Sequence, residues 1–143
     1  MKISDLLASK GTAVATVDPG ASVADAVEEL AAHNVGALVV SANGSRVEGI
    51  VSERDVVRAL RSASAEALKQ SVSSIMSAEV RTCSPEDTVD SLMITMTEHR
   101  IRHVPVVVDG QLQGIVSIGD VVKSRIGELE DDRKALYDYI NAR

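Results

Sequence analysis

The chain has 143 residues, a length that suits one compact domain or two small halves that share a core. Its 15 basic and 21 acidic residues give a net charge of −6, which argues against general binding to nucleic acid or to an anionic membrane surface. No apolar run is long enough to cross a membrane, and residues 1–10 lack the apolar core of a signal peptide. The single cysteine, Cys83, excludes an intrachain disulfide and fits a reducing compartment, so we expect a cytoplasmic protein.

The first half of the chain predicts a short helix followed by a β-α-β-β-α unit. Ser22 stands three residues before Asp25 and directly before apolar residues at helical spacing, which indicates a capped amphipathic helix. The Val-rich run at 35–40 is too short for a helix and is typical of a buried strand. The elements expected here are a helix over 1–10, an extended segment over 11–17, a helix from Ser22 to His33, strands over 35–40 and 47–51 joined by a tight turn at Asn43–Gly44, and a helix over 52–60.

The second half predicts the same order of elements after a linker. Thr88 is a suitable N-cap for a helix, and Asp109–Gly110 is a dipeptide typical of a two-residue hairpin turn. The elements expected here are a partly helical linker over 62–74, a strand over 80–83, a helix capped by Thr88, strands over 101–108 and 112–116, and a final helix from about 118 that breaks at Gly127.

The two halves are copies of one unit. Pro19 and Pro85 lie 66 residues apart, and Gly49 and Gly114 lie 65 residues apart, so the repeats differ by one residue in a turn. Neither copy alone buries both faces of a three-stranded sheet, so we expect them to stack about a pseudo-twofold axis. The expected organisation is a lead segment over 1–13, a first repeat over 14–61, a linker over 62–79, a second repeat over 80–126 and a C-terminal helix over 127–143.

Each copy carries the motif Gly-Ile-Val-Ser-x-x-Asp, at 49–55 and at 114–120. The serine stands where a helix N-cap is expected, and the aspartate follows in the first turn. One interpretation is a helix-capping box that satisfies free backbone amides. The other is a site where the serine, the amides and the carboxylate meet a polar ligand with hydroxyl groups. Recurrence at equivalent positions of both copies gives weight to the second interpretation.

The sequence offers no recognisable catalytic or metal-binding group. Cys83 stands on an expected strand without a histidine at dyad spacing, and a buried, inert thiol is the simpler interpretation. There is no pair of metal ligands at i, i+4, no Gly-rich phosphate loop and no G-x-S-x-G segment. We therefore expect a binding protein and not an enzyme, with no metal and no resident cofactor.

These segments resemble CBS domains, which are named after cystathionine β-synthase. The resemblance rests on Pro19 and Pro85, on the apolar strands in 36–40 and 102–106, and on the paired motifs, and it covers about 14–123. Two such domains in tandem form a Bateman module, and the chain is similar to the stand-alone bacterial pairs. The resemblance implies an α/β (α+β) fold of two β-α-β-β-α repeats. It also implies a regulatory role, because similar family members bind adenine nucleotides and others bind S-adenosylmethionine or NAD(H).

The resemblance further implies two equivalent ligand clefts between the repeats. In each, an aspartate takes the ribose hydroxyls, apolar side chains flank the adenine, and backbone of the other repeat reads its edge. The favoured cleft would combine Ile50, Ser52, Arg54 and Asp55 with Val80, Arg81, Ile101, Arg102, His103 and Pro105. The second cleft would combine Ile115, Ser117 and Asp120 with Val14, Ala15, Val35, Gly36 and Ala37.

The two expected clefts differ in charge. Arg54 and Arg102 stand where the other repeat has Gly119 and Gly36, so positive charge gathers at the Asp55 end. An anionic nucleotide such as AMP is therefore expected in that cleft. Two alternatives stay open: both arginines face solvent, and the histidine that follows Arg102 is structural.

Two functions of different class are consistent with this sequence. The first is a regulatory module that senses an adenine nucleotide of AMP, ADP or ATP type and modulates an unidentified partner protein; sensing of NAD(H) or S-adenosylmethionine is a variant of it. The second is a structural or interaction protein whose clefts are vestigial. For both, the apolar pairs Val56–Val57 and Val121–Val122 on equivalent helices predict a homodimer. Nucleic acid and membranes are not expected among the partners.

Overall fold

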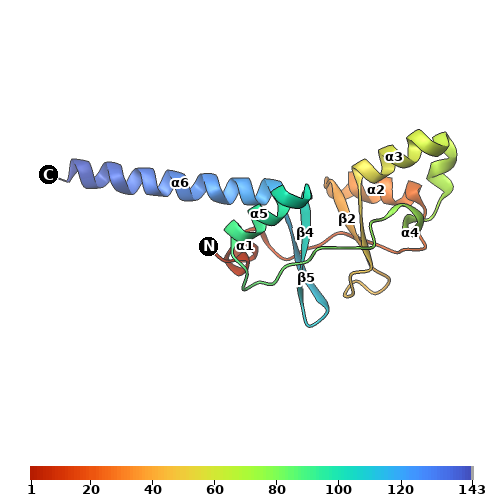
Figure 1. Ribbon diagram of the computed structural model, residues 1–143, viewed down its shortest axis with the longest axis horizontal. Helices are drawn as coiled ribbons and strands as arrows, with labels where there is room; N and C mark the ends of the chain where they lie inside the picture. Colours follow the sequence, from red (N-terminus) through yellow and green to blue (C-terminus); the bar gives the residue numbers. More distant parts are fainter. Residues whose placement is uncertain (143) are drawn as a thin grey trace.

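The computed structural model describes residues 1–142 as two sheet-and-helix units, with one long helix projecting from the second (Figure 1). In the first unit, β1 is parallel and β3 is antiparallel to the central strand β2. The second unit contains the antiparallel pair β4–β5. The elements in chain order are α1 (Ile3–Lys10), β1 (Thr16–Val17), α2 (Val23–His33), β2 (Ala37–Val40), β3 (Gly49–Ser52), α3 (Glu53–Ala63), the 3₁₀ helix η1 (Ser64–Lys69), α4 (Val72–Ile75), α5 (Val89–His99), β4 (His103–Val108), β5 (Gln111–Ser117) and α6 (Ile118–Asn141).

Local signals determine where most helices begin. The Oγ of Ser22 accepts a hydrogen bond from the backbone N–H of Asp25 at 3.1 Å, and the Asp25 carboxylate accepts one from the backbone N–H of Ser22 at 3.2 Å. Thr88 caps α5 through the backbone N–H of Ser91. The hairpin turn at 109–110 has φ angles of 50° and 77°, as a turn with two left-handed residues requires. These predicted caps and this turn are confirmed.

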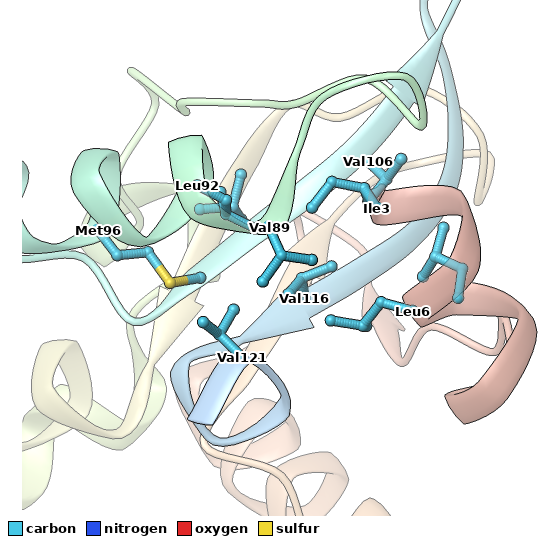
Figure 2. Packing of buried hydrophobic residues seen from close by; sticks show 10 residues of the cluster. Ile3, Leu6, Val89, Leu92, Met96, Val106, Val116 and Val121 are labelled. Carbon is cyan, nitrogen blue, oxygen red and sulfur yellow. The ribbon is translucent and has the colours of Figure 1, made fainter. Parts of the chain in front are cut away.

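Each unit has its own apolar core, and each core includes the helix that precedes the other unit. Helix α1 places Ile3, Leu6 and Leu7 in the second core, against α5, β4, β5 and α6 (Figure 2). Helix α4 places Val72 in the first core, where its side chain is fully buried. Because apolar burial is the main stabilising contribution, this reciprocal packing makes each unit depend on a segment next to the other.

The close approach of these helices explains the glycine at the start of each motif. A Cβ atom at Gly49 would lie 2.5 Å from the Sδ of Met76 and 2.9 Å from the carbonyl oxygen of Ser77. At Gly114 it would lie 2.8 Å from a methyl group of Leu7. In both units, glycine at this position therefore makes room for the segment that crosses from the other unit.

The strand predicted over 80–83 is wrong in extent. The chain is hydrogen-bonded to β3 at Ser77 and next to β4 at Cys83, whose N–H donates to the carbonyl oxygen of Pro105 at 3.0 Å. Residues 78–82 cross from one sheet to the other and have no strand partner among the described residues. The first strand of the second repeat is therefore reduced to one parallel bridge at Cys83.

The tight turn predicted at Asn43–Gly44 is part of a longer loop over 41–48. The side-chain oxygen of Asn43 accepts hydrogen bonds from the N–H groups of Ser45 and Arg46, both at 2.9 Å, which folds the loop onto itself. The carbonyl oxygen of Ser45 then accepts a hydrogen bond from the N–H of Leu112 at 2.7 Å. The loop is longer than a hairpin turn and contacts β5 of the other unit.

The break predicted at Gly127 is wrong, because α6 runs without interruption from Ile118 to Asn141. A glycine in a helix interior costs only about 1 kcal/mol, and strong helix formers flank this one. The helix predicted over 127–143 ends at residue 143, which lies outside the described residues. None of the helices within residues 1–142 has the length and hydropathy of a membrane span.

Candidate functional site

The first serine–aspartate motif lies at the junction of β3 and α3. The Oδ2 atom of Asp55 accepts hydrogen bonds from the backbone N–H and the hydroxyl of Ser52, at 2.8 and 3.0 Å. The Oγ of Ser52 in turn accepts one from the backbone N–H of Asp55 at 3.3 Å. The motif is thus a helix-capping box, but these bonds use only one carboxylate oxygen. Among residues 1–142 the carboxylate of Asp55 has no ion-pair partner, which leaves its second oxygen available to a ligand.

The second motif has the same cap but a different neighbour. Ser117 and Asp120 exchange hydrogen bonds of 2.9 and 3.1 Å, as their counterparts do. In addition, Lys10 at the end of α1 donates from Nζ to the Asp120 carboxylate and to the carbonyl oxygen of Ile115, the latter at 2.8 Å. Burial would raise the pKa of Asp120, but the hydrogen bonds from Lys10 and Ser117 outweigh it and hold the pKa below its ordinary value of 3.8. The Asp120 carboxylate, unlike that of Asp55, is therefore paired with a lysine of the chain, although its hydrogen bonds too all fall on Oδ2.

The different surroundings of the two carboxylates follow from the reciprocal packing of α1 and α4. These helices align with an offset of 69 residues, so that Leu7 corresponds to Met76 and Lys10 corresponds to Glu79. Glu79 is exposed and carries the charge opposite to that of Lys10. Because a glutamate cannot form an ion pair with Asp55, the first carboxylate has no equivalent of the lysine.

Three arginines line one pocket of about 450 Å³ where α5 ends and α6 begins. Arg54 comes from the first turn of α3, and Arg102 directly precedes β4. Arg100 is the C-cap of α5 and has a left-handed backbone with φ of 53°. The remaining lining residues are Met96, Thr97, Ile101 and Ile118. Three guanidinium groups beside apolar side chains suit an anionic group that is attached to a flat apolar one.

A second pocket of about 450 Å³ occupies the equivalent place in the first unit. Asn34 stands at the position of Arg100 and has the same left-handed backbone, with φ of 51°. Gly36 stands at the position of Arg102, and among the described lining residues only Glu53 is charged. The two pockets are therefore built from equivalent elements but differ in charge. One is lined by three arginines, and the other has a single charged lining residue, a glutamate.

His103 lies at a place different from the one expected for the favoured cleft. A Cβ atom at Gly36 would be 3.5 Å from the Cε1 atom of His103 and 3.8 Å from a carboxylate oxygen of Glu53, so the imidazole faces the first unit. Burial lowers the pKa of His103, and the charge of Asp120 opposes this only in part. The structure thus brings His103 near Gly36, a residue expected in the other cleft.

The structure brings some of the remaining expected residues together and separates others. Arg54, Ile101 and Arg102 line one pocket, and Val35 and Gly36 line the other. Neither serine–aspartate pair, Ser52–Asp55 or Ser117–Asp120, is among the lining residues of these two pockets. Pro105 is fully buried and cannot offer its side chain to a ligand. The other positions are as follows: Val80 and the exposed Arg81 on the crossing segment 78–82, Val14 and Ala15 before β1, Ala37 in β2, Ile50 in β3 and Ile115 in β5.

Two residues of this region were missed by sequence reasoning. Arg100 corresponds to Asn34, and a left-handed cap in one repeat predicts the same backbone in the other. Lys10 lies outside both repeats, and only the alignment of α1 with α4 connects it with the second motif. Cys83, by contrast, is as expected: burial, with a smaller effect of Asp87, raises the pKa of its thiol to about 12, which suppresses the reactive thiolate.

Comparison with known proteins supports the repeat assignment. The sequence profile of the CBS domain matches residues 3–62 and again residues 72–127. The crystal structure of a CBS-domain protein from Agrobacterium tumefaciens, ATU1752, is 49% identical with a TM-score of 0.83, and the match covers 87% of this chain and 92% of that one.

Two further similar structures are complexes with small ligands. The CBS domain protein PAE2072 from Pyrobaculum aerophilum, complexed with AMP, is 30% identical with a TM-score of 0.75 over 84% of this chain and 89% of that one. The CBS domain pair of protein MJ0100, in complex with 5′-methylthioadenosine and S-adenosyl-L-methionine, is 26% identical with a TM-score of 0.79 over 90% and 98%. With two profile matches that together span most of its length, the chain belongs to the CBS domain family and contains two CBS domains in tandem.

Proposed function

We propose that this protein is a regulatory module that binds an adenine nucleotide of AMP type at the Asp55 end of the molecule. The observation that carries the proposal is the gathering of Arg54, Arg100 and Arg102 in one pocket, together with the position of Arg54 next in sequence to Asp55, a carboxylate that has no ion-pair partner within residues 1–142. The structures of PAE2072 with AMP and of MJ0100 with adenosine-type ligands support the ligand class.

The chemistry of the site matches a nucleoside phosphate. A carboxylate such as Asp55 accepts hydrogen bonds from both hydroxyls of a ribose, and each charge-assisted bond contributes about 1.5–3 kcal/mol. Guanidinium groups bind phosphate oxygens through parallel hydrogen bonds. The same arginines disfavour S-adenosylmethionine, whose sulfonium is positive, so the charge of the pocket favours AMP over that alternative.

Calorimetry on the full chain with AMP, adenosine and S-adenosylmethionine tests the ligand. We expect AMP to bind more tightly than adenosine, and the preference to shrink as salt rises, since the pocket is open to solvent. Replacing Arg100 and Arg102 together by alanine should weaken the binding of AMP about tenfold or more and leave the affinity for adenosine nearly unchanged. The matched control is Arg46→Ala in the loop 41–48, which lies outside the pocket. An unchanged preference for AMP in the double variant would refute the phosphate site, and no binding of any of the three compounds would favour the interaction protein.

We further infer that the module acts as a cytoplasmic homodimer that modulates a partner protein and has no catalytic role. Val56 and Val121 lie in the two cores, whereas their neighbours Val57 and Val122 are exposed on equivalent helices and are available to a second copy. Within residues 1–142, no group of His, Cys, Asp and Glu side chains is suited to hold a metal ion.

A further inference from the structure

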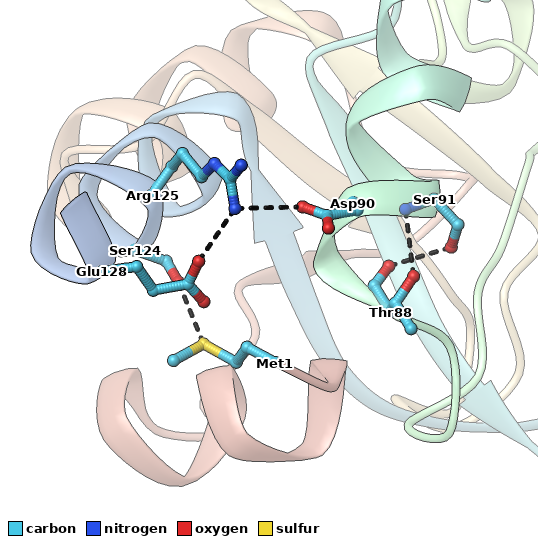
Figure 3. A network of polar contacts seen from close by, with 7 residues as sticks. All are labelled: Met1, Thr88, Asp90, Ser91, Ser124, Arg125 and Glu128. Carbon is cyan, nitrogen blue, oxygen red and sulfur yellow. Dashed lines mark hydrogen bonds and ion pairs between the residues drawn. The ribbon is translucent and has the colours of Figure 1, made fainter. Parts of the chain in front are cut away.

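The last described turns of α6 project away from the rest of residues 1–142 (Figure 1). The base of the helix is anchored: Nη1 of Arg125 lies 3.5 Å from an Asp90 carboxylate oxygen on α5 and 3.0 Å from one of Glu128, and Ser124 contacts Met1 (Figure 3). From residue 129 onward every described residue is exposed, and the helix projects away from both units (Figure 1). A helix that is amphipathic and lacks a packing partner is only marginally stable in water.

An apolar stripe follows this projecting part of α6. Ile126, Leu129, Leu136 and Ile140 are spaced 3, 7 and 4 residues apart, and each is more than half exposed. They occupy the a and d positions of a heptad repeat, with Arg133 at the one remaining a position. Val122, half exposed, is the preceding d residue, so the stripe runs over residues 122–140, about 27 Å at a rise of about 1.5 Å per residue.

We propose that α6 pairs with α6 of a second copy of this chain as a parallel, two-stranded coiled coil. Isoleucine at a with leucine at d is the combination that favours a parallel dimer. Ile126 and Ile140 at a and Leu129 and Leu136 at d follow it, and the first d residue is Val122. An α6 stripe of 3.5-residue period gives the left-handed supercoil that such a pair requires.

The charges beside the stripe fit the same arrangement. Arg133 at the a position packs next to the g residue of the facing helix, which in a parallel pair is Asp132 of the partner subunit. The two arginines of the layer are thus each beside an aspartate, and a charged a residue selects a dimer at some loss of stability. The pairing surface is separate from the arginine pocket and goes beyond the proposed homodimer by fixing its seam and its polarity.

The first test is the dimer dissociation constant of the full chain, measured by analytical ultracentrifugation. Replacing Leu129 and Leu136 together by glutamate should raise this constant about a hundredfold, because four like charges would enter the seam. The matched control is Ala135→Glu, at a c position on the outer face, which should leave the constant unchanged. A dimer of unchanged affinity in the double variant, or a monomeric parent chain at all concentrations, overturns the proposal.

The second test addresses orientation. In a parallel pair the two copies of a d residue face each other, so Leu136→Cys should form an intermolecular disulfide under mild oxidation. The parent chain, which retains the half-buried Cys83, is the control and should stay uncrosslinked. Loss of dimerisation in the glutamate variant without crosslinking of Leu136→Cys would mean antiparallel helices, and would overturn the parallel arrangement.

Discussion

The Asp55 and Asp120 ends of the molecule have the same capping box and different neighbours. In both, the serine and the aspartate satisfy the first turn of a helix through equivalent hydrogen bonds. At one end the carboxylate is left to solvent, and at the other Lys10 binds it. The comparison shows that a duplicated motif conserves its local geometry through the backbone, whereas its electrostatics depends on side chains that come from elsewhere in the chain.

These more distant side chains come from the segment that precedes each repeat. Since α1 packs into the second core, Lys10 at its end reaches the Asp120 motif, whereas α4 packs into the first core. Lys10 is the last residue of α1, and the residue that aligns with it after α4 is Glu79, which has the opposite charge. We therefore expect the two ends to respond differently to matched substitutions.

The largest effect on stability is expected from substitutions at the two motif glycines, where a side chain would displace Met76 and Ser77 or Leu7. Gly49→Ala should lower the free energy of unfolding by about 3 kcal/mol, because the new methyl group meets the rigid backbone of Ser77 at 2.9 Å as well as Met76. Gly114→Ala should cost about 1 kcal/mol, because the methyl group meets only the side chain of Leu7, which can move. Chemical denaturation measures both.

The control for this pair is Gly127→Ala, where a Cβ atom has open space and helix propensity should instead stabilise α6 slightly. Equal losses of unfolding free energy in Gly49→Ala and Gly114→Ala would contradict the idea that the neighbour of Gly49 is more rigid than that of Gly114.

A second effect concerns ligand binding at the two carboxylates. Asp55→Ala should weaken the binding of AMP by about ten- to hundredfold, the loss expected when charge-assisted contacts with a ribose are removed. Asp120→Ala should change AMP affinity less than about twofold, because its carboxylate is already bound by Lys10. Titration calorimetry with both variants reports the difference. A larger loss at Asp120 would mean that the ligand displaces the lysine and that the favoured end is the wrong one.

The fold was largely predictable because its signals are local, whereas the charges of the site were not. Ser22 and Thr88 cap their helices through residues three positions away, and such patterns are readable in sequence. The contact between Lys10 and Asp120 joins positions 110 residues apart and depends on α1 entering the second core. The strand predicted over 80–83 failed for a related reason, since that segment must leave one sheet in order to reach the other.

A third and smaller effect is expected from removing the lysine. Lys10→Met should leave Asp120 half-buried and without its cation, which lowers stability by about 1 kcal/mol and makes the carboxylate available. The number of adenosine molecules bound per chain, measured by calorimetry, should then rise from one toward two. Glu79→Met at the equivalent position is the matched control and should leave this number unchanged. A stoichiometry that stays at one in Lys10→Met would show that the second cleft is closed by more than the lysine.

The smallest effect is a pH dependence confined to the Asp120 end. The folded-state pKa of Asp120 is held below 3.8 by Lys10 and Ser117 against the effect of burial, so the unfolded chain takes up this proton first as pH falls. The stabilisation is therefore present above about pH 4 and is lost as pH falls through the folded pKa, with a total of no more than about 1 kcal/mol for a partly exposed pair. Denaturation of the parent chain and of Asp120→Asn between pH 6 and pH 3 should give stabilities that converge in acid. In the Lys10→Met background the convergence should weaken, because the main group that lowers the pKa is gone. A constant gap across this range would show that the ion pair does not contribute to stability and that the lysine acts only by filling the cleft.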